Sequence, residues 1–260
     1  MMATPSLLLP LQSSHASDIV ALVAIIAGLL TFAEYSASYP SIVEFRDAPP
    51  INRLRFISLM ATVFFLSVTF KHQFEPNSIT ASFAHLGVAI GKLVDFPYSP
   101  VRLVLVMLPK DASAATYETV RIAAGVAYLF SVISAITFVF AVRVLGWPIG
   151  NGAFNVWVNL PLFDPTTGGD VVNRLQRDGW INVILGILLP FALPAIVELG
   201  MTVWTPLPLN HPQSQIWIIS AWAFVPASML MRGTAMLRIA ELIEEKRRRA
   251  YANAEALQTA

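Results

Sequence analysis

The sequence predicts an all-α, polytopic integral membrane protein with about five transmembrane helices. Of its 260 residues, 56% are apolar and 13% charged, where soluble domains carry about 25% charged residues, and its mean hydropathy is +0.64. Its apolar residues also gather in runs near the roughly 20 residues that cross a bilayer as a helix. A membrane barrel would need alternating strands of about ten residues instead, and the sequence shows no such pattern.

The five apolar runs predict spans over residues 19–37, 54–70, 122–142, 180–204 and 216–237. The third run has no charged residue, which is typical of a helix surrounded by hydrocarbon. The second is short and carries Arg55 near its start. We therefore expect either a span close to the bilayer normal or an Arg55 side chain that reaches the interface.

The positions of lysine and arginine predict the orientation, because cytoplasmic flanks retain positive charge. With five spans, one side receives 12 basic residues and the other 5, Lys71, Lys92, Arg102, Lys110 and Arg121. The first group ends in the run from Lys246 to Arg249. We expect an extracytoplasmic N-terminus, a cytoplasmic C-terminus and a plasma membrane location, in a bacterium the inner membrane.

Three regions follow from this topology: an extracytoplasmic tail over residues 1–17, a membrane domain over 18–240 and a basic helical tail over 241–260. The tail at the N-terminus has no basic residue and too short an apolar core for a secretory signal, so we expect it to be retained. The fifth span is predicted to continue as a helix to about Glu255. Two four-residue charge pairs support this continuation, Glu244 with Arg248 and Glu245 with Arg249.

The segment 78–109 between the second and third spans is too apolar for a solvated loop. Large apolar residues recur in its first half at helical spacing, namely Ile79, Phe83, Leu86, Ile90 and Leu93. This pattern indicates an amphipathic helix lying at the membrane interface, capped by Asn77 or Ser78. A re-entrant hairpin is the alternative.

Charged residues inside the spans are the best indicators of function, because an ionisable group in hydrocarbon needs a partner or water. Glu34 lies at a depth similar to that of Arg232 and near that of Arg143, so we expect an ion pair there. Glu198 lies nearer the outer face, where the basic residues are Lys71 and Arg121. Such residues either tie helices together or form an ion path, and no chain of polar residues visibly joins Glu34 to Glu198.

Pro190 and Pro194 are four residues apart in the fourth span. Proline removes a backbone donor and kinks a helix, and broken helices in transporters expose carbonyls that bind ions. The pair predicts an ordinary kink, with an ion site as the alternative.

No motif for catalysis, phosphate binding or metal binding is present. The four histidines all fall outside the spans, and His72, His85 and His211 lack the spacing of metal ligands on one helix. Cysteine is absent, which excludes thiolate ligands and a cysteine nucleophile. We predict no cofactor beyond bound lipids, no nucleic-acid partner and no enzymatic activity.

Two classes of function remain. The favoured class is a non-catalytic subunit, or an assembly or scaffolding factor, of a larger membrane complex, with a basic run that contacts lipid or a partner. The residues expected to make that contact are Lys246, Arg247, Arg248 and Arg249. The alternative is a small transporter or channel with a site near Glu198 and the Pro190 and Pro194 kink. A lipid-active membrane enzyme would require its outward histidines and acidic residues to cluster.

Overall fold

The computed structural model describes residues 1–10, 14–109, 111–148, 154–163, 168–200, 209 and 211–258. This part of the chain is built from helices joined by loops and contains no β-strand. The helices are α1 (Thr4–Leu8), α2 (Ser14–Ser36), α3 (Ile51–Lys71), α4 (Ser78–Val94), α5 (Pro100–Val106), α6 (Ala114–Arg143), α7 (Val156–Asn159), α8 (Val171–Gly200) and α9 (Pro212–Gln258).

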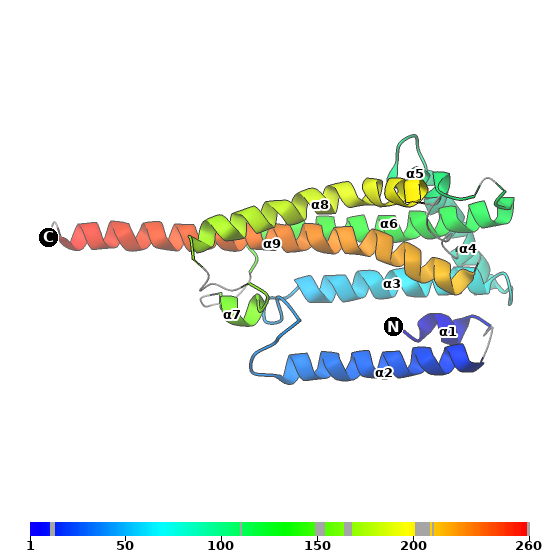
Figure 1. The fold of residues 1–260 in the computed structure, drawn as a ribbon, viewed down its shortest axis with the longest axis horizontal. Coiled ribbons are helices and arrows are strands. Elements are labelled where there is room, and N and C mark those ends of the chain that lie inside the picture. Colours follow the sequence, from blue (N-terminus) through cyan, green and yellow to red (C-terminus); the bar gives the residue numbers. More distant parts are fainter. Residues whose placement is uncertain are drawn as a thin grey trace.

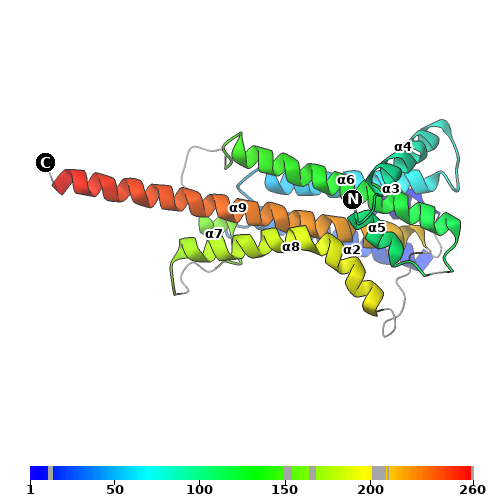
Figure 2. The ribbon, with the colours of Figure 1, turned by 90° about the horizontal axis from the view of Figure 1, so that it is seen from above.

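Five of these helices, α2, α3, α6, α8 and α9, are long and apolar enough to cross a membrane. The all-α, five-span fold class is thereby confirmed. The helices contain the predicted apolar runs almost completely, and residues 201–204 of the fourth run lie outside the described residues. The start of α3, the end of α6 and the start of α8 lie together at one end of the bundle (Figures 1 and 2), which we call the C-terminal end because α9 leaves the bundle there.

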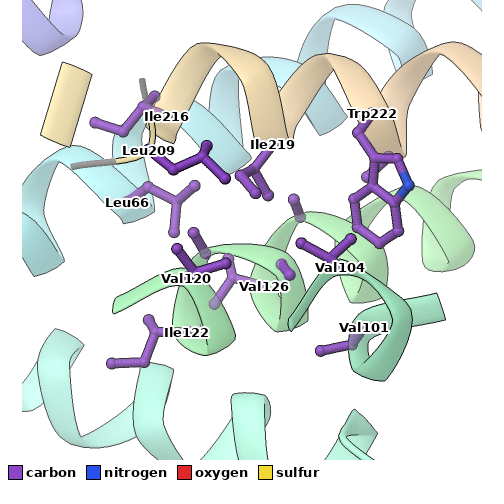
Figure 3. Close-up of a cluster of buried hydrophobic side chains, with 14 of the residues drawn as sticks. Leu66, Val101, Val104, Val120, Ile122, Val126, Leu209, Ile216, Ile219 and Trp222 are labelled. Atoms are coloured by element: carbon purple, nitrogen blue, oxygen red, sulfur yellow. The ribbon is translucent and has the colours of Figure 1, made fainter. Parts of the chain in front are cut away.

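Helices α3, α6, α8 and α9 form the bundle around two apolar cores. The larger core, at the end opposite the C-terminus, joins Leu66 of α3, Val126 of α6 and Ile219 of α9 (Figure 3). The second core lies at the C-terminal end and includes Phe138 of α6 and Met236 of α9. Because hydrocarbon surrounds the bundle, close packing rather than exclusion from water holds such helices together.

Glycines allow α8 and α9 to approach backbone to backbone. A Cβ atom on Gly233 of α9 would lie 2.5 Å from the carbonyl oxygen of Gly179 in α8, and one on Gly186 would lie 2.8 Å from the backbone nitrogen of Leu230. Both distances are shorter than a real Cβ tolerates. Toward the other end of the bundle the two helices diverge in both views, and α8 bends away from α9 (Figure 2).

The segment 78–109 forms α4 and α5, and both pack against the bundle. Gly91 of α4 fits against α6, because a Cβ on Gly125 would lie 2.7 Å from the Cα of Gly91. Val101 and Val104 of α5 are buried in the larger core (Figure 3). The segment is therefore part of the helix packing at this end of the bundle.

The predicted helix over residues 78–96 and its N-cap are confirmed. The Asn77 side chain accepts a hydrogen bond from the Thr80 backbone at 2.9 Å and completes a capping box. The apolar stripe keeps an exposed face, with Ile79, Leu86 and Leu93 at 68%, 53% and 74% exposure. Gly87 and Gly91 lie on the face of α4 that packs against the protein. The large apolar residues are therefore on the face that is available to lipid.

Helix α2 stands apart from the bundle (Figure 1). Across Asp18–Ser36 no residue of its most apolar window is buried, whereas 22–50% of the corresponding windows of the other four long helices is buried. Between α1 and α3 there is direct packing, and Leu9 just after α1 is buried in the larger core. The predicted N-terminal tail is thus partly folded onto the bundle.

Helix α9 extends well beyond the bundle (Figures 1 and 2). Its 47 residues correspond to about 70 Å of helix at 1.5 Å per residue. The expected continuation past the fifth span is confirmed and reaches Gln258.

Only one of the two charge pairs expected on this extension is formed. Arg249 lies 3.8 Å from Glu245, whereas the described residues show no ion pair between Glu244 and Arg248, so that expected pair is wrong. Both of these side chains are exposed, and a pair in water gains too little to hold two long side chains in one geometry. The extension is therefore helical without the Glu244 pair, and the Arg248 charge faces the surroundings.

Candidate functional site

A charged network at the C-terminal end of the bundle is the best-built polar site among the described residues. Arg232 of α9 binds Glu44 through two contacts, from Nε to Oε2 at 2.6 Å and from Nη2 to Oε1 at 2.8 Å. The Glu44 side chain is 9% exposed and that of Arg232 is 26% exposed. A bidentate, largely buried pair of this kind fixes both partners in one geometry.

Arg55 of α3 completes this network. Its Nη2 donates to the carbonyl oxygen of Ser228 in α9 at 3.0 Å, and its Nη1 contacts Asn52 Oδ1 at 3.4 Å. Asn52 in turn donates to the Glu44 carbonyl oxygen at 2.7 Å. Arg55 therefore links α3 to α9, and of the two alternatives for the second span its contacts do not support the one in which this side chain reaches the interface.

The loop that carries Glu44 is held by α7 and by the turn that follows α6. Phe45 has a φ of 54° and is fully buried, and its backbone donates to the Asn159 carbonyl oxygen at 2.6 Å. The Asp47 backbone donates to Asn159 Oδ1 at 3.0 Å. The indole of Trp147, also fully buried, donates to the Pro49 carbonyl oxygen at 3.1 Å. These contacts hold residues 43–50 in one position, and we call this segment the cap.

Glu34 does not pair with Arg232 or Arg143, so the expected ion pair is wrong. Its carboxylate instead accepts hydrogen bonds from the Ser41 hydroxyl and from the backbones of Ser41, Ile42 and Val43, at 2.6–3.0 Å. The pattern of charges inside the apolar runs does not indicate Glu44, because this residue lies between the first two runs. The available signal was its position in the loop that connects the first two spans, two residues before Arg46.

The basic residues expected near Glu198 have other partners. Lys71 pairs with Glu75 at 2.9 Å and Arg121 pairs with Glu118, each within its own segment of chain. Glu198 is exposed near the end of α8, and no polar contact of its carboxylate is found among the described residues. The described part of the chain does not bring Glu34 and Glu198 into one polar path.

Pro190 and Pro194 lie within one continuous helix, α8, which bends in its last part (Figure 2). Pro194 has no N–H group to donate to the carbonyl oxygen of Pro190 one turn earlier. That oxygen accepts a hydrogen bond of 3.2 Å from the indole of Trp222 in α9 instead. The carbonyl released by Pro194 therefore joins two helices, and this favours the ordinary kink over an ion site.

The four residues of the basic run differ in what they contact, although all four are exposed on the α9 extension. Arg247 binds Asp170, the residue before α8, with Nη1 2.7 Å from Oδ1, and Arg249 has the long contact with Glu245. For Lys246 and Arg248 the described residues show no ion pair. These two side chains keep their charge available to lipid head groups or to a partner.

The contact between Arg247 and Asp170 docks the extension against the start of α8. This hydrogen bond, and a second from the Val172 backbone, hold the pKa of the Asp170 carboxyl below its ordinary value of 3.8. The charge of Arg247 thus serves in part to fix the direction in which α9 leaves the bundle.

The Asp170 contact predicts a pH dependence at acid pH only. Because the folded-state pKa is lowered, the ionised Asp170 carboxylate stabilises the contact at pH values above its ordinary pKa of 3.8. This stabilisation is lost as the pH falls toward the folded-state pKa. With spin labels on cysteines at Gly168 and Tyr251, we expect a narrow interspin distance distribution at neutral pH that broadens in acid, below the ordinary value of 3.8. Asp170→Asn should be broad at both, and an unchanged wild-type distribution would contradict this assignment.

No candidate metal cluster is found among the described residues. They contain no group of three or more histidine or acidic side chains that could hold a metal ion. His72 is engaged through Nδ1 with the Thr80 hydroxyl at 2.9 Å. The charged network joins arginines to a glutamate and a backbone carbonyl, and these mutual hydrogen bonds fix the structure.

The chain matches no family model, no curated protein and no solved structure. Function is therefore argued from the geometry of this structure alone.

Proposed function

We propose that this protein is a non-catalytic membrane subunit, or an assembly or scaffolding factor, of a larger membrane complex, with α2 as its main contact to another chain. The observation that carries the proposal is the isolation of α2, an apolar helix of which no residue in the membrane-spanning window is buried. Membrane helices gain stability by packing against other helices. In the described structure, no residue in the spanning window of α2 is buried by such contacts.

Helix α2 is nevertheless held in a fixed position at its C-terminal end. The Glu34 carboxylate binds the backbone of residues 41–43, and Arg46 Nη1 donates to the Glu34 carbonyl oxygen at 3.1 Å and to that of Ala37. The next turn of the loop carries Glu44, which binds Arg232. A helix placed this firmly beside the bundle presents a defined surface to a partner.

The apolar surface of α2 has the chemistry of a transmembrane helix contact. Leu22, Ile26 and Leu29 share one face and are 58%, 47% and 64% exposed. The partner that fits this face is an apolar transmembrane helix of a different chain. Lipid alone would also cover this apolar face. A helix surrounded only by lipid would not need the contacts that hold α2 in one position beside the bundle.

The α9 extension supports a second contact. It projects from the bundle (Figure 1) and bears exposed side chains such as Tyr251 and Leu257, at 69% and 80% exposure. With the orientation that the basic residues favour, this end faces the cytoplasm and the N-terminus faces outward. The proposed location is a plasma membrane, in a bacterium the inner membrane, with a cytoplasmic partner or anionic lipid at residues 246–249.

Site-specific photo-crosslinking in native membranes tests the proposal. A benzophenone side chain placed at Leu29 in α2 should crosslink to a second, different protein chain. The control is Phe140 in α6, which is also exposed, at 51% against 64% for Leu29, but belongs to a helix already packed in the bundle. The control should give lipid adducts only.

Purification in mild detergent should then recover the same chain in fixed stoichiometry. Two results would reject the proposal. Either Leu29 gives lipid adducts like the control, or all its protein crosslinks lead to another copy of this chain, in which case α2 serves self-association.

A further inference from the structure

A groove between α6, α8 and α9 lies near the C-terminal end of the bundle. It is a cavity of about 160 Å³. Its apolar wall includes Val139 and Val183, and its polar end is formed by Arg143, Arg238 and Glu241. No function discussed above uses this groove.

The polar end has an excess of positive charge. Glu241 is shared by the two arginines, with Oε2 3.1 Å from Arg238 Nη1 and Oε1 3.9 Å from Arg143 Nη1. Arg238 also donates to the Trp147 carbonyl oxygen at 3.3 Å. Two guanidinium groups against one carboxylate leave a net charge of about +1. The Arg143 side chain is 67% exposed and makes only the long contact, so it is able to bind an anion.

The shape and position of the groove select the class of ligand. A cavity of about 160 Å³ corresponds to a sphere roughly 7 Å in diameter, too narrow for an α-helix about 10–12 Å across. A flexible acyl chain, in contrast, fits between ridges of side chains. Trp180 borders the groove and is 57% exposed, and tryptophan is typical of the boundary between hydrocarbon and head groups. An apolar channel with a cationic end at that boundary matches a phospholipid.

We propose that this groove binds one anionic glycerophospholipid, with its phosphate on Arg143 and part of an acyl chain along Val139 and Val183. The phosphate oxygens replace the distant Glu241 as acceptors for Arg143, while Arg238 keeps Glu241 in place. Charge-assisted hydrogen bonds from a guanidinium to phosphate are short and specific. The site is independent of the partner proposed for α2.

Native mass spectrometry of the delipidated protein, titrated with phosphatidylglycerol, tests this site. Arg143→Gln should weaken the first bound lipid roughly fivefold, as expected for loss of one basic contact. Val139→Trp, which fills the groove and keeps the charge, should weaken it as well. The matched control Arg53→Gln removes one charge from an exposed side chain at the start of α3, which does not line the groove, and should leave the first adduct unchanged.

Three results would overturn the proposal. The first is equal binding of phosphatidylglycerol by wild type and Arg143→Gln. The second is an equal loss in Arg53→Gln, which would show attraction to the overall charge. The third is equal binding of phosphatidylcholine by wild type, which would exclude selection for an anionic lipid.

Discussion

Replacing Gly233 with alanine should separate α8 from α9 and lower the melting temperature of the detergent-solubilised protein by roughly 3–8 °C. The added Cβ would lie 2.5 Å from the Gly179 carbonyl oxygen and 2.8 Å from the Val183 backbone nitrogen. Because these are backbone atoms, a side-chain rotation cannot relieve the contact. Overpacking of this kind costs about 1–3 kcal/mol, more than the up to about 1 kcal/mol that alanine gains over glycine in a helix.

Gly28 in α2 provides the matched control, because a Cβ there meets no atom within 4 Å. Gly28→Ala should leave the melting temperature unchanged or raise it slightly. Tryptophan fluorescence during heating gives the readout, since Trp222 of α9 contacts α8 through the Pro190 carbonyl oxygen. Equal melting temperatures for both variants would contradict the close α8–α9 contact.

Glu44→Gln is expected to have the second large effect. It removes the carboxylate that Arg232 binds at 2.6 and 2.8 Å and leaves two guanidinium groups, those of Arg232 and Arg55, facing a neutral amide. Breaking a buried pair costs about 3–5 kcal/mol. We expect the lower part of that range, because the Arg232 side chain is 26% exposed.

Thermal unfolding, monitored by size-exclusion chromatography of heated samples, measures this loss of stability. Glu245→Gln is the control, since its pair with Arg249 is long and exposed and should contribute under about 0.5 kcal/mol. The double variant Glu44→Gln with Arg232→Gln should be more stable than Glu44→Gln alone, because Arg232 no longer remains unpaired. A Glu44→Gln variant as stable as the control would show that the network does not hold the cap.

The sequence was sufficient to predict the spans because their determinant is local. A run of apolar residues and the length needed to cross hydrocarbon set each helix, whatever packs against it. The start of α8 shows the limit. The fourth apolar run begins at residue 180, whereas α8 begins nine residues earlier, at Val171. Gly179, just before that run, lies in the close contact with α9.

The pairing of charges was not predictable from depth alone. Glu34 and Arg232 were matched by level along the membrane normal, but the partner is decided by the loop after α2. That loop turns back on Glu34 with its backbone N–H groups and places Glu44 against Arg232. The contacts of Asn159 and Trp147 that fix this loop join positions about 100 residues apart in sequence, and no local pattern shows them.

The sequence also does not show that α2 stands apart from the bundle. Its mean hydropathy of 2.0 is close to the 2.2 of α6 and α8, because lipid and neighbouring helices are equally apolar surroundings. Composition therefore predicts that a helix enters the membrane but not what it contacts there. The close contact of Gly87 and Gly91 in α4 with α6 is likewise a feature that composition does not show.

Labelling of single cysteines tests the five-span topology most directly, and the absence of native cysteine makes it clean. One variant carries cysteine at Ala3 and the other at Ala254, and intact cells are treated with a membrane-impermeant maleimide. We predict labelling at position 3 in intact cells and at position 254 only after permeabilisation. Labelling of both positions, or of neither, before permeabilisation would place the two termini on the same side and contradict the topology.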